Sequence, residues 1–346
     1  MNQTIVEIRN QYEALEKTLD LFDKKREALS AAWKKAAPKA LVFLGCDSSY
    51  MVSCSLRDAA GAMTDLPVYA FAAGDLWLNH ARYRRQLSGA MVVAVSRSGR
   101  TSEILHAADA LRADGVEFTL CSLIAAVETP LGQRSAISVE IPWAFDESVC
   151  QTRSVSNLYA AGLSLLAAFT GDGTLPARLR KLAAEGPAYL RKAEPLMARI
   201  AKEGWNKAMV LADGVCAGLA TEGALAFQEI SQLPGVQHHV LDVRHGPIVL
   251  VDEKTLVLVY LYPDGQPQQE ALIKDLQKKG AKVLVYSNLP REIPGAESIS
   301  LGADVDEAPG GIAFLNLCQL AAYEKSMETG SDPDAPTGLD AWIQVN

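Results

Sequence analysis

Short apolar runs alternate with amphipathic segments along most of the chain, a pattern typical of strands followed by helices. Residues 90–95 are apolar and rich in valine, which predicts a strand buried on both faces, as parallel strands usually are. Apolar residues at helical spacing follow from Ile104, and Gly115 ends the predicted helix. The intervening loop, residues 96–101, therefore leads from the carboxyl end of a buried strand into a helix.

The same order of elements occurs twice. Residues 91–122 and 256–287 each read as strand, turn, amphipathic helix, glycine, strand and serine, and Gly115 recurs 165 positions later as Gly280. Residues 40–51 and 208–219 correspond at nearly the same offset. We therefore predict an α/β fold of two similar, doubly wound parallel sheets of the flavodoxin-like kind, arranged as an internal repeat.

This pattern also predicts how the chain is divided. The predicted parts are an N-terminal helix over residues 1–34, a first α/β domain over 35–170, a helical connector over 171–200, a second α/β domain over 201–328, and a C-terminal tail over 329–346.

The loop of the first half, "SRSGRTSEI" from residue 96, has the composition of a phosphate site. Backbone N–H groups and the positive dipole end of a helix favour an anion. Ser96, Ser98 and Thr101 add hydroxyl donors, and Arg97 adds positive charge. The alternative is a capped helix start with Ser98 or Thr101 as N-cap. The matching stretch of the second half, residues 262–267, has no serine or threonine and carries an acid, so we expect phosphate in the first half.

Composition narrows the classes of partner and cofactor. The net charge of −8 argues against nucleic acid and anionic membranes as partners. The apolar stretch 158–169 is too short to span a bilayer, and no signal peptide is visible. Six scattered cysteines without a C-x-x-C pair indicate a reduced, cytoplasmic protein. No histidine or cysteine spacing matches a metal site, so we expect neither a metal nor another cofactor.

Four stretches, taken in order, resemble the sugar isomerase (SIS) domain family in its tandem form. They are "GCDSSYM" (45–51), "SRSGRTSEIL" (96–105), "ESVCQTRSVSN" (147–157) and "EGALAFQEIS…VRHGP" (222–247). The family includes the isomerase half of glucosamine-fructose-6-phosphate aminotransferase, amino-sugar-phosphate deaminase/isomerases, and deglycases of phosphorylated sugar–amine adducts. The resemblance covers residues 40–346 and implies the tandem fold and a hexose 6-phosphate ligand.

The resemblance also implies the binding residues. The phosphate would be held by Ser96, Arg97, Ser98, Thr101 and Ser49. The sugar would be lined by Ser48, Val149, Gln151 and Thr152. Asp47 stands where family members typically have glycine, and an acid beside a phosphate is unfavourable unless it points away or meets a cation such as Arg97 or Arg153.

Two residues would carry the chemistry if the resemblance holds. Glu229 matches the glutamate that moves a proton between C1 and C2 of the open-chain sugar, and burial would raise its pKa toward neutrality. His245, in "RHGP", matches the histidine that opens the sugar ring, often from a neighbouring subunit, which implies a homodimer or higher oligomer. Taken without the family, Glu229 is a solvated surface charge and His245 a structural histidine at a bend.

Departures from the aminotransferase pattern favour amine release over amine transfer. Ala226 stands where that enzyme has a lysine, and Ala341 lies near the place of its C-terminal lysine. The sequence begins Met1-Asn2 and offers no N-terminal cysteine nucleophile, so we do not expect a glutaminase domain. The sequence thus predicts a deaminase or deglycase acting through an enolamine or enediol. The alternatives are a plain aldose–ketose phosphosugar isomerase and a non-catalytic sugar-phosphate sensor; no G-x-G-x-x-G supports a dehydrogenase.

Overall fold

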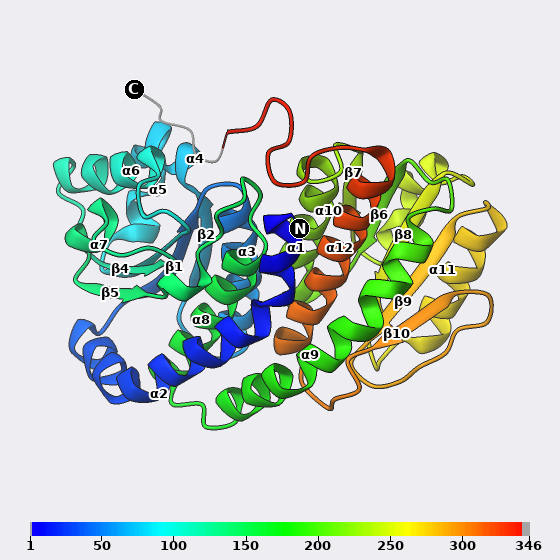
Figure 1. The fold of residues 1–346 in the computed structure, drawn as a ribbon. Coiled ribbons are helices and arrows are strands. Elements are labelled where there is room, and N and C mark those ends of the chain that lie inside the picture. Colours follow the sequence, from blue (N-terminus) through cyan, green and yellow to red (C-terminus); the bar gives the residue numbers. More distant parts are fainter. Residues whose placement is uncertain (1, 341–346) are drawn as a thin grey trace. The chain divides into compact units, whose positions relative to one another are not determined.

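The computed structural model describes residues 2–340 and divides the chain into two compact units (Figure 1). We call residues 13–147 with 153–180 the N-terminal unit. The C-terminal unit consists of residues 181–339 together with the chain up to Tyr12 and the short loop Ser148–Thr152. The loop 148–152 therefore packs with the C-terminal unit although its sequence neighbours on both sides belong to the other unit.

The N-terminal unit is built on a five-stranded parallel sheet in the order β2-β1-β3-β4-β5. Every residue of β1 and β3 is buried, as expected for apolar central strands covered on both faces. The strands are β1 (Ala40–Gly45), β2 (Val68–Ala72), β3 (Ala90–Ser96), β4 (Phe118–Ile124) and β5 (Ile137–Glu140). The predicted strand at residues 90–95 is confirmed by β3.

Helices join these strands and pack around the sheet. They are α2 (Gln11–Ala36), α3 (Ser48–Gly61), α4 (Ala73–Leu78), α5 (His80–Leu87), α6 (Ser102–Ala113), α7 (Pro130–Arg134), the 3₁₀ turn η1 (Pro142–Ala144) and α8 (Arg153–Thr170). On α6 the residues Ile104, Ala108 and Leu111 face the core at a helical spacing, alongside Val92 and Ala94 of β3. Apolar periodicity thus fixes which side of α6 lies on the sheet.

The C-terminal unit repeats this architecture. Its parallel sheet has the order β10-β9-β8-β6-β7, which is the order of the first sheet with corresponding strands in corresponding places. The strands are β6 (Lys207–Leu211), β7 (Gly235–His238), β8 (Thr255–Tyr260), β9 (Lys282–Ser287) and β10 (Glu297–Ser300). The predicted fold class, two doubly wound sheets related by an internal repeat, is confirmed.

The helices of this unit include one that precedes the first sheet in the chain. They are α1 (Gln3–Arg9), α9 (Leu175–Ile200) from Lys181 onward, η2 (Gly214–Cys216), α10 (Ala217–Glu229), η3 (Asp242–His245), η4 (Pro247–Leu250), α11 (Gln266–Lys278) and α12 (Glu307–Thr329). Gln11, the first residue of α2 and two residues after α1, bonds Gln319 and Asn316 of the buried helix α12 with its side chain at 3.0 and 2.6 Å. A polar network thereby ties the start of the chain to the second domain.

Candidate functional site

In the loop between β3 and α6, the serine and threonine hydroxyls contact one another and accept hydrogen bonds from amides of the same loop. The amide of Gly99 donates to Ser96 Oγ at 2.9 Å, and the amide of Arg100 donates to Ser98 Oγ at 3.2 Å. Thr101 occupies the N-cap position of α6 but makes no side-chain capping bond, and its Oγ1 lies 3.2 Å from Ser96 Oγ. The hydroxyls therefore shape the loop itself, and the Thr101 side chain does not cap the N-terminus of α6, whose dipole favours an anion.

A second loop, which contains Thr129, packs against this loop and supports it. This contact was not predicted from the sequence. Gly99 adopts φ +61°, and a Cβ there would stand 2.5 Å from Thr129 Oγ1. The Gly99 carbonyl accepts from the amide of Leu131 at 3.1 Å, while Thr129 Oγ1 accepts from the amide of Gly132 and caps α7. A threonine followed by proline is the N-cap signal that marks this support in the sequence.

Ser48 and Ser49 lie in the first turn of α3, directly after the neighbouring strand β1. Both are buried. The tight turn depends on Gly45, because a side chain there would collide with the backbone of Ser49. The sheet order reverses between β1 and β3, and the carboxyl ends of strands at such a switch point are where doubly wound sheets bind ligands. Two of the predicted phosphate-contacting segments therefore meet at one sheet edge.

Asp47 is held in an unfavourable backbone conformation at this edge. Its φ of 47° and ψ of −118° lie in a region that favours glycine, which accounts physically for the glycine expected there. Desolvation raises the pKa of its carboxyl, although much of the residue's surface stays exposed. Within residues 2–340 it forms no ion pair. The two candidate cations lie elsewhere: Arg97 is over the Phe145 ring at 6.0 Å, and Arg153 Nε is 3.8 Å from Asp146 Oδ1.

We expect Asp47→Gly to stabilise the protein and to strengthen phosphosugar binding. Relief of strain worth about 1–3 kcal/mol outweighs the entropy cost of glycine, about 0.5–1 kcal/mol, and a negative charge is removed beside the proposed anion. Urea unfolding and phosphosugar titration measure the two effects. Ala37→Gly is the matched control: it relieves a φ of 40° at the end of α2 and should raise stability alone. Unchanged stability in Asp47→Gly would contradict the strain.

The loop Ser148–Thr152 is fixed by buried polar groups of the C-terminal unit. The Glu7 carboxylate accepts from the Ser148 amide at 3.3 Å and from the Ser148 hydroxyl. Gln319 Nε2 donates to the Thr152 carbonyl at 3.1 Å, and the Val149 amide donates to the Asp334 carbonyl at 3.1 Å. These bonds hold the candidate sugar-lining residues Val149, Gln151 and Thr152 in place. The part played by Glu7 and Gln319 was not anticipated from the sequence.

The candidate proton-transfer residues also lie in the C-terminal unit. Glu229 is the last residue of α10 and is half-buried, while Ala226, one turn earlier, is buried. His245 ends η3, is exposed, and is followed by Gly246 at φ 155°. Ala341, placed near the family's C-terminal lysine, lies outside the described residues. The roles of Glu229 and His245 remain predictions.

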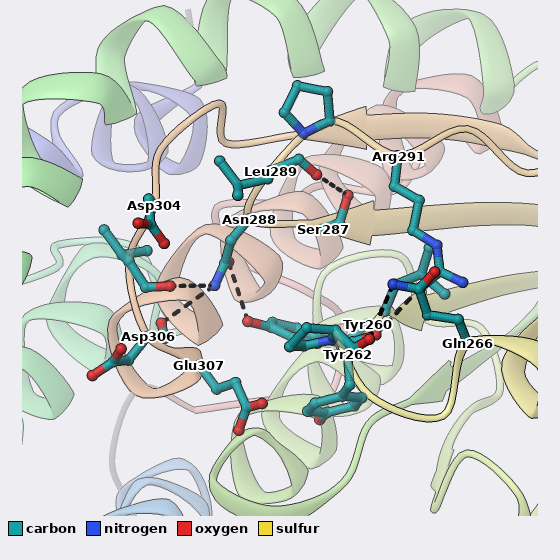
Figure 2. A pocket seen from close by; sticks show the side chains of 14 residues that line it. Tyr260, Tyr262, Gln266, Ser287, Asn288, Leu289, Arg291, Asp304, Asp306 and Glu307 are labelled. Carbon is teal, nitrogen blue, oxygen red and sulfur yellow. Dashed lines mark hydrogen bonds between the residues drawn. The ribbon is translucent and has the colours of Figure 1, made fainter.

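A pocket separate from all of these residues opens in the C-terminal unit. It has a volume of about 740 Å³ and lies where β8 and β9 end and α12 begins (Figure 2). Its walls include Tyr260, Tyr262, Asn288, Arg291 and Glu307, and none of the site residues expected from the sequence lines it. Across residues 2–340, no histidine, cysteine and carboxylate groups are placed to hold a metal ion, and no helix combines the length and apolarity that crossing a membrane requires.

A comparison with known protein families finds a match for the second of the two repeats. Residues 203–323 match the family model described as SIS domain. The chain contains a SIS domain. This SIS domain spans all five strands of the second sheet. The first sheet repeats its strand order, so both units have the SIS fold. The resemblance drawn from the four sequence stretches is thereby confirmed.

The chain is similar to two kinds of known protein. It is 25% identical to glutamine–fructose-6-phosphate aminotransferase [isomerizing] of Caulobacter vibrioides over 98% of its own length and 58% of that protein, and it spans about half the length of the curated relatives it matches. Its fold matches glucosamine-6-phosphate deaminase of Thermotoga maritima (TM-score 0.85, 22% identity, 99% and 100% of the two chains) and tagatose-6-phosphate ketose/aldose isomerase of Escherichia coli (TM-score 0.86, 21% identity, 100% and 97%).

Proposed function

We propose that this SIS protein is an enzyme that releases an amine from an aminated hexose 6-phosphate. The observation that carries the proposal is the hydroxyl-lined loop between β3 and α6, which lies beside Ser48 and Ser49 at the switch point of the first sheet. Backbone amides, hydroxyls and a helix N-terminus are together suited to a dianionic phosphate. The relatives named for phosphosugar isomerisation and deamination support the same ligand class.

The reaction needs one proton moved between adjacent carbons. With a 1-amino-ketose, Glu229 takes a proton from C1 to give the enolamine and returns it to C2, which leaves an imine at C1. Water adds to that imine, and the C–N bond breaks to give a hexose phosphate and a free amine. With a 2-amino-aldose the proton moves from C2 to C1 and the imine forms at C2. A carboxylate on one face of the sugar suffices for either direction.

The side chains near Glu229 favour hydrolysis over amine transfer. Ala226 supplies no amine one turn before it, and this position is buried. An adduct or amino sugar brings its own nitrogen, so the enzyme needs no lysine and no ammonia from glutamine. The absence of glutaminase activity is part of the proposal.

His245 would open the sugar ring by proton transfer to the ring oxygen, from one subunit to the next in a homo-oligomer. Its exposure supports this role, as does the apolar surface after it, where Val249 is 75% and Leu250 63% exposed. We expect Val249→Asp with Leu250→Asp to dissociate the oligomer and to lower activity at least tenfold. Sedimentation equilibrium and turnover measure this. An intact oligomer with full activity would exclude this surface as the contact.

The experiment that tests the function is a turnover assay over a panel of substrates. The panel contains amine adducts of hexose 6-phosphates, glucosamine 6-phosphate and fructose 6-phosphate, and both released amine and hexose phosphate are quantified. Amine release in equal amount with hexose phosphate is expected. Interconversion of fructose 6-phosphate with an aldose and no amine release would indicate a plain isomerase. Binding of these compounds without turnover would indicate a sensor and overturn the proposal.

A further inference from the structure

The pocket in the C-terminal unit occupies the place that the candidate phosphate loop has in the first repeat. The segment between β8 and α11 corresponds to the segment between β3 and α6, and the 165-residue offset aligns residue 261 with 96. Parallel strands end at this edge, which is where doubly wound sheets bind ligands. The pocket of about 740 Å³ is large enough for a small organic molecule.

Its loop has lost the features that bind phosphate. Leu261, Tyr262 and Pro263 follow β8, and no serine or threonine lies in residues 261–267. Proline has no backbone N–H to donate, and Pro267 removes a further donor from the first turn of α11. The carboxylate of Asp264 in this loop also repels an anion. The second repeat therefore has a pocket at the corresponding sheet edge but lacks the hydroxyl and amide donors that favour phosphate.

The walls of the pocket are fixed by partly buried hydrogen bonds. Asn288 Oδ1 accepts from the Tyr260 hydroxyl at 3.1 Å, and Asn288 Nδ2 donates to the Val305 carbonyl at 2.9 Å (Figure 2). The buried side chain of Gln269 spans the loop, with its Oε1 accepting from the Tyr262 amide at 2.9 Å and its Nε2 donating to the Tyr262 carbonyl at 3.1 Å. The pocket is thus preformed, which lowers the entropy cost of binding.

Negative charge dominates one side of the pocket. Asp304, Asp306 and Glu307 line the pocket along the side where α12 begins (Figure 2), and Lys181 Nζ donates to the Asp304 carbonyl at 3.1 Å. Desolvation, and then the nearby Asp264, raise the pKa of Glu307. The cation in the lining, Arg291, is already engaged, with its guanidinium 3.3 Å from Glu270 Oε1 and bonded to the Tyr262 carbonyl at 3.2 Å. The favourable dipole at the start of α12 explains acids at 306 and 307 but not the one at 304.

We propose that this pocket binds an organic ammonium ion, with its apolar body on the tyrosine wall and its charged nitrogen toward the acidic side of the pocket, which Asp304, Asp306 and Glu307 line. Tyr260 and Tyr262, with ring centroids 4.8 Å apart, form the aromatic wall for the apolar body, and Tyr262 is the more exposed of the two. Leu289 and Pro290 extend the apolar lining. The site is independent of the proposed amine release, because it shares no residue with the candidate catalytic residues.

Three probes that share a six-carbon chain, one positively charged, one neutral and one negatively charged, test this directly. Hexylamine, hexan-1-ol and hexanoate are titrated into the full chain at pH 7 by isothermal calorimetry, together with inorganic phosphate. We expect one hexylammonium ion to bind about tenfold more tightly than hexan-1-ol, as two or three partly exposed charge contacts allow. Equal affinity for the amine and the alcohol, tighter binding of hexanoate, or no binding of hexylamine would overturn the proposal.

Variants locate the binding. Asp304→Asn with Glu307→Gln should weaken hexylamine about tenfold and leave hexan-1-ol unchanged, while Glu253→Gln, an exposed acid before β8, should change neither. Asp304→Asn alone, at an exposed position, serves if the double variant does not fold. Glu229→Gln should retain hexylamine binding. Loss of hexylamine binding in Glu229→Gln, or unchanged hexylamine affinity in the double variant, would place the amine at another site and overturn the assignment.

Discussion

Glu229→Gln is expected to lower kcat for amine release at least 100-fold while KM changes less than about threefold. The amide keeps the size and hydrogen-bonding reach of the carboxylate but cannot take a proton, and a positioned acid/base contributes about 10²–10⁴-fold. The effect falls on kcat because the proposed proton transfer occurs after the phosphate is bound. Steady-state turnover of the best substrate of the panel gives both constants.

The matched control for this variant is Glu292→Gln. Glu292 is exposed in the segment between β9 and β10, so loss of its charge should leave both constants unchanged. Protection of Glu229→Gln against thermal unfolding by the phosphosugar verifies that the ligand still binds. Turnover within a few-fold of the wild-type rate would remove Glu229 from the mechanism, while loss of binding would assign it a structural role.

Gly99→Ala is expected to raise KM for the phosphosugar at least 30-fold. Two costs act together: an alanine at φ +61° is strained by about 1–2 kcal/mol, and its Cβ meets the side chain of Thr129, so the loop must move away from α7. Movement of the loop displaces Ser96 Oγ, to which the Gly99 amide donates. Competition by inorganic phosphate should weaken by a similar factor.

Gly115→Ala separates the two costs. Gly115 has φ +72° with open space around it, so alanine there brings a similar backbone strain without a collision and far from the loop in sequence. We expect it to lower the free energy of unfolding by about 1 kcal/mol and to leave KM unchanged. Urea unfolding of both variants, with KM for each, makes the comparison. Equal KM values in the two variants would show that the shape of the phosphate loop does not control binding.

Much of the fold follows from local sequence patterns. Valine-rich strands such as β3, the spacing of Ile104, Ala108 and Leu111 on α6, and glycines after helices are readable because burial imposes a period of two or 3.6 residues on neighbouring positions. The internal repeat was visible for the same reason, since two halves with equal element order carry equal patterns at a constant offset.

The sequence alone also predicts which loop is suited to phosphate, because hydroxyls, a glycine and arginines lie consecutively between a strand and a helix. Only the tertiary structure revealed the brace from Thr129 under Gly99, the bonds from Glu7 and Gln319 to residues 148–152, and the strained backbone of Asp47. The pocket beside Tyr260 and Glu307 was likewise revealed only by the tertiary structure. Contacts between residues far apart in the chain impose no local period, so they exist only once the sheets have formed and brought their strand ends to one edge.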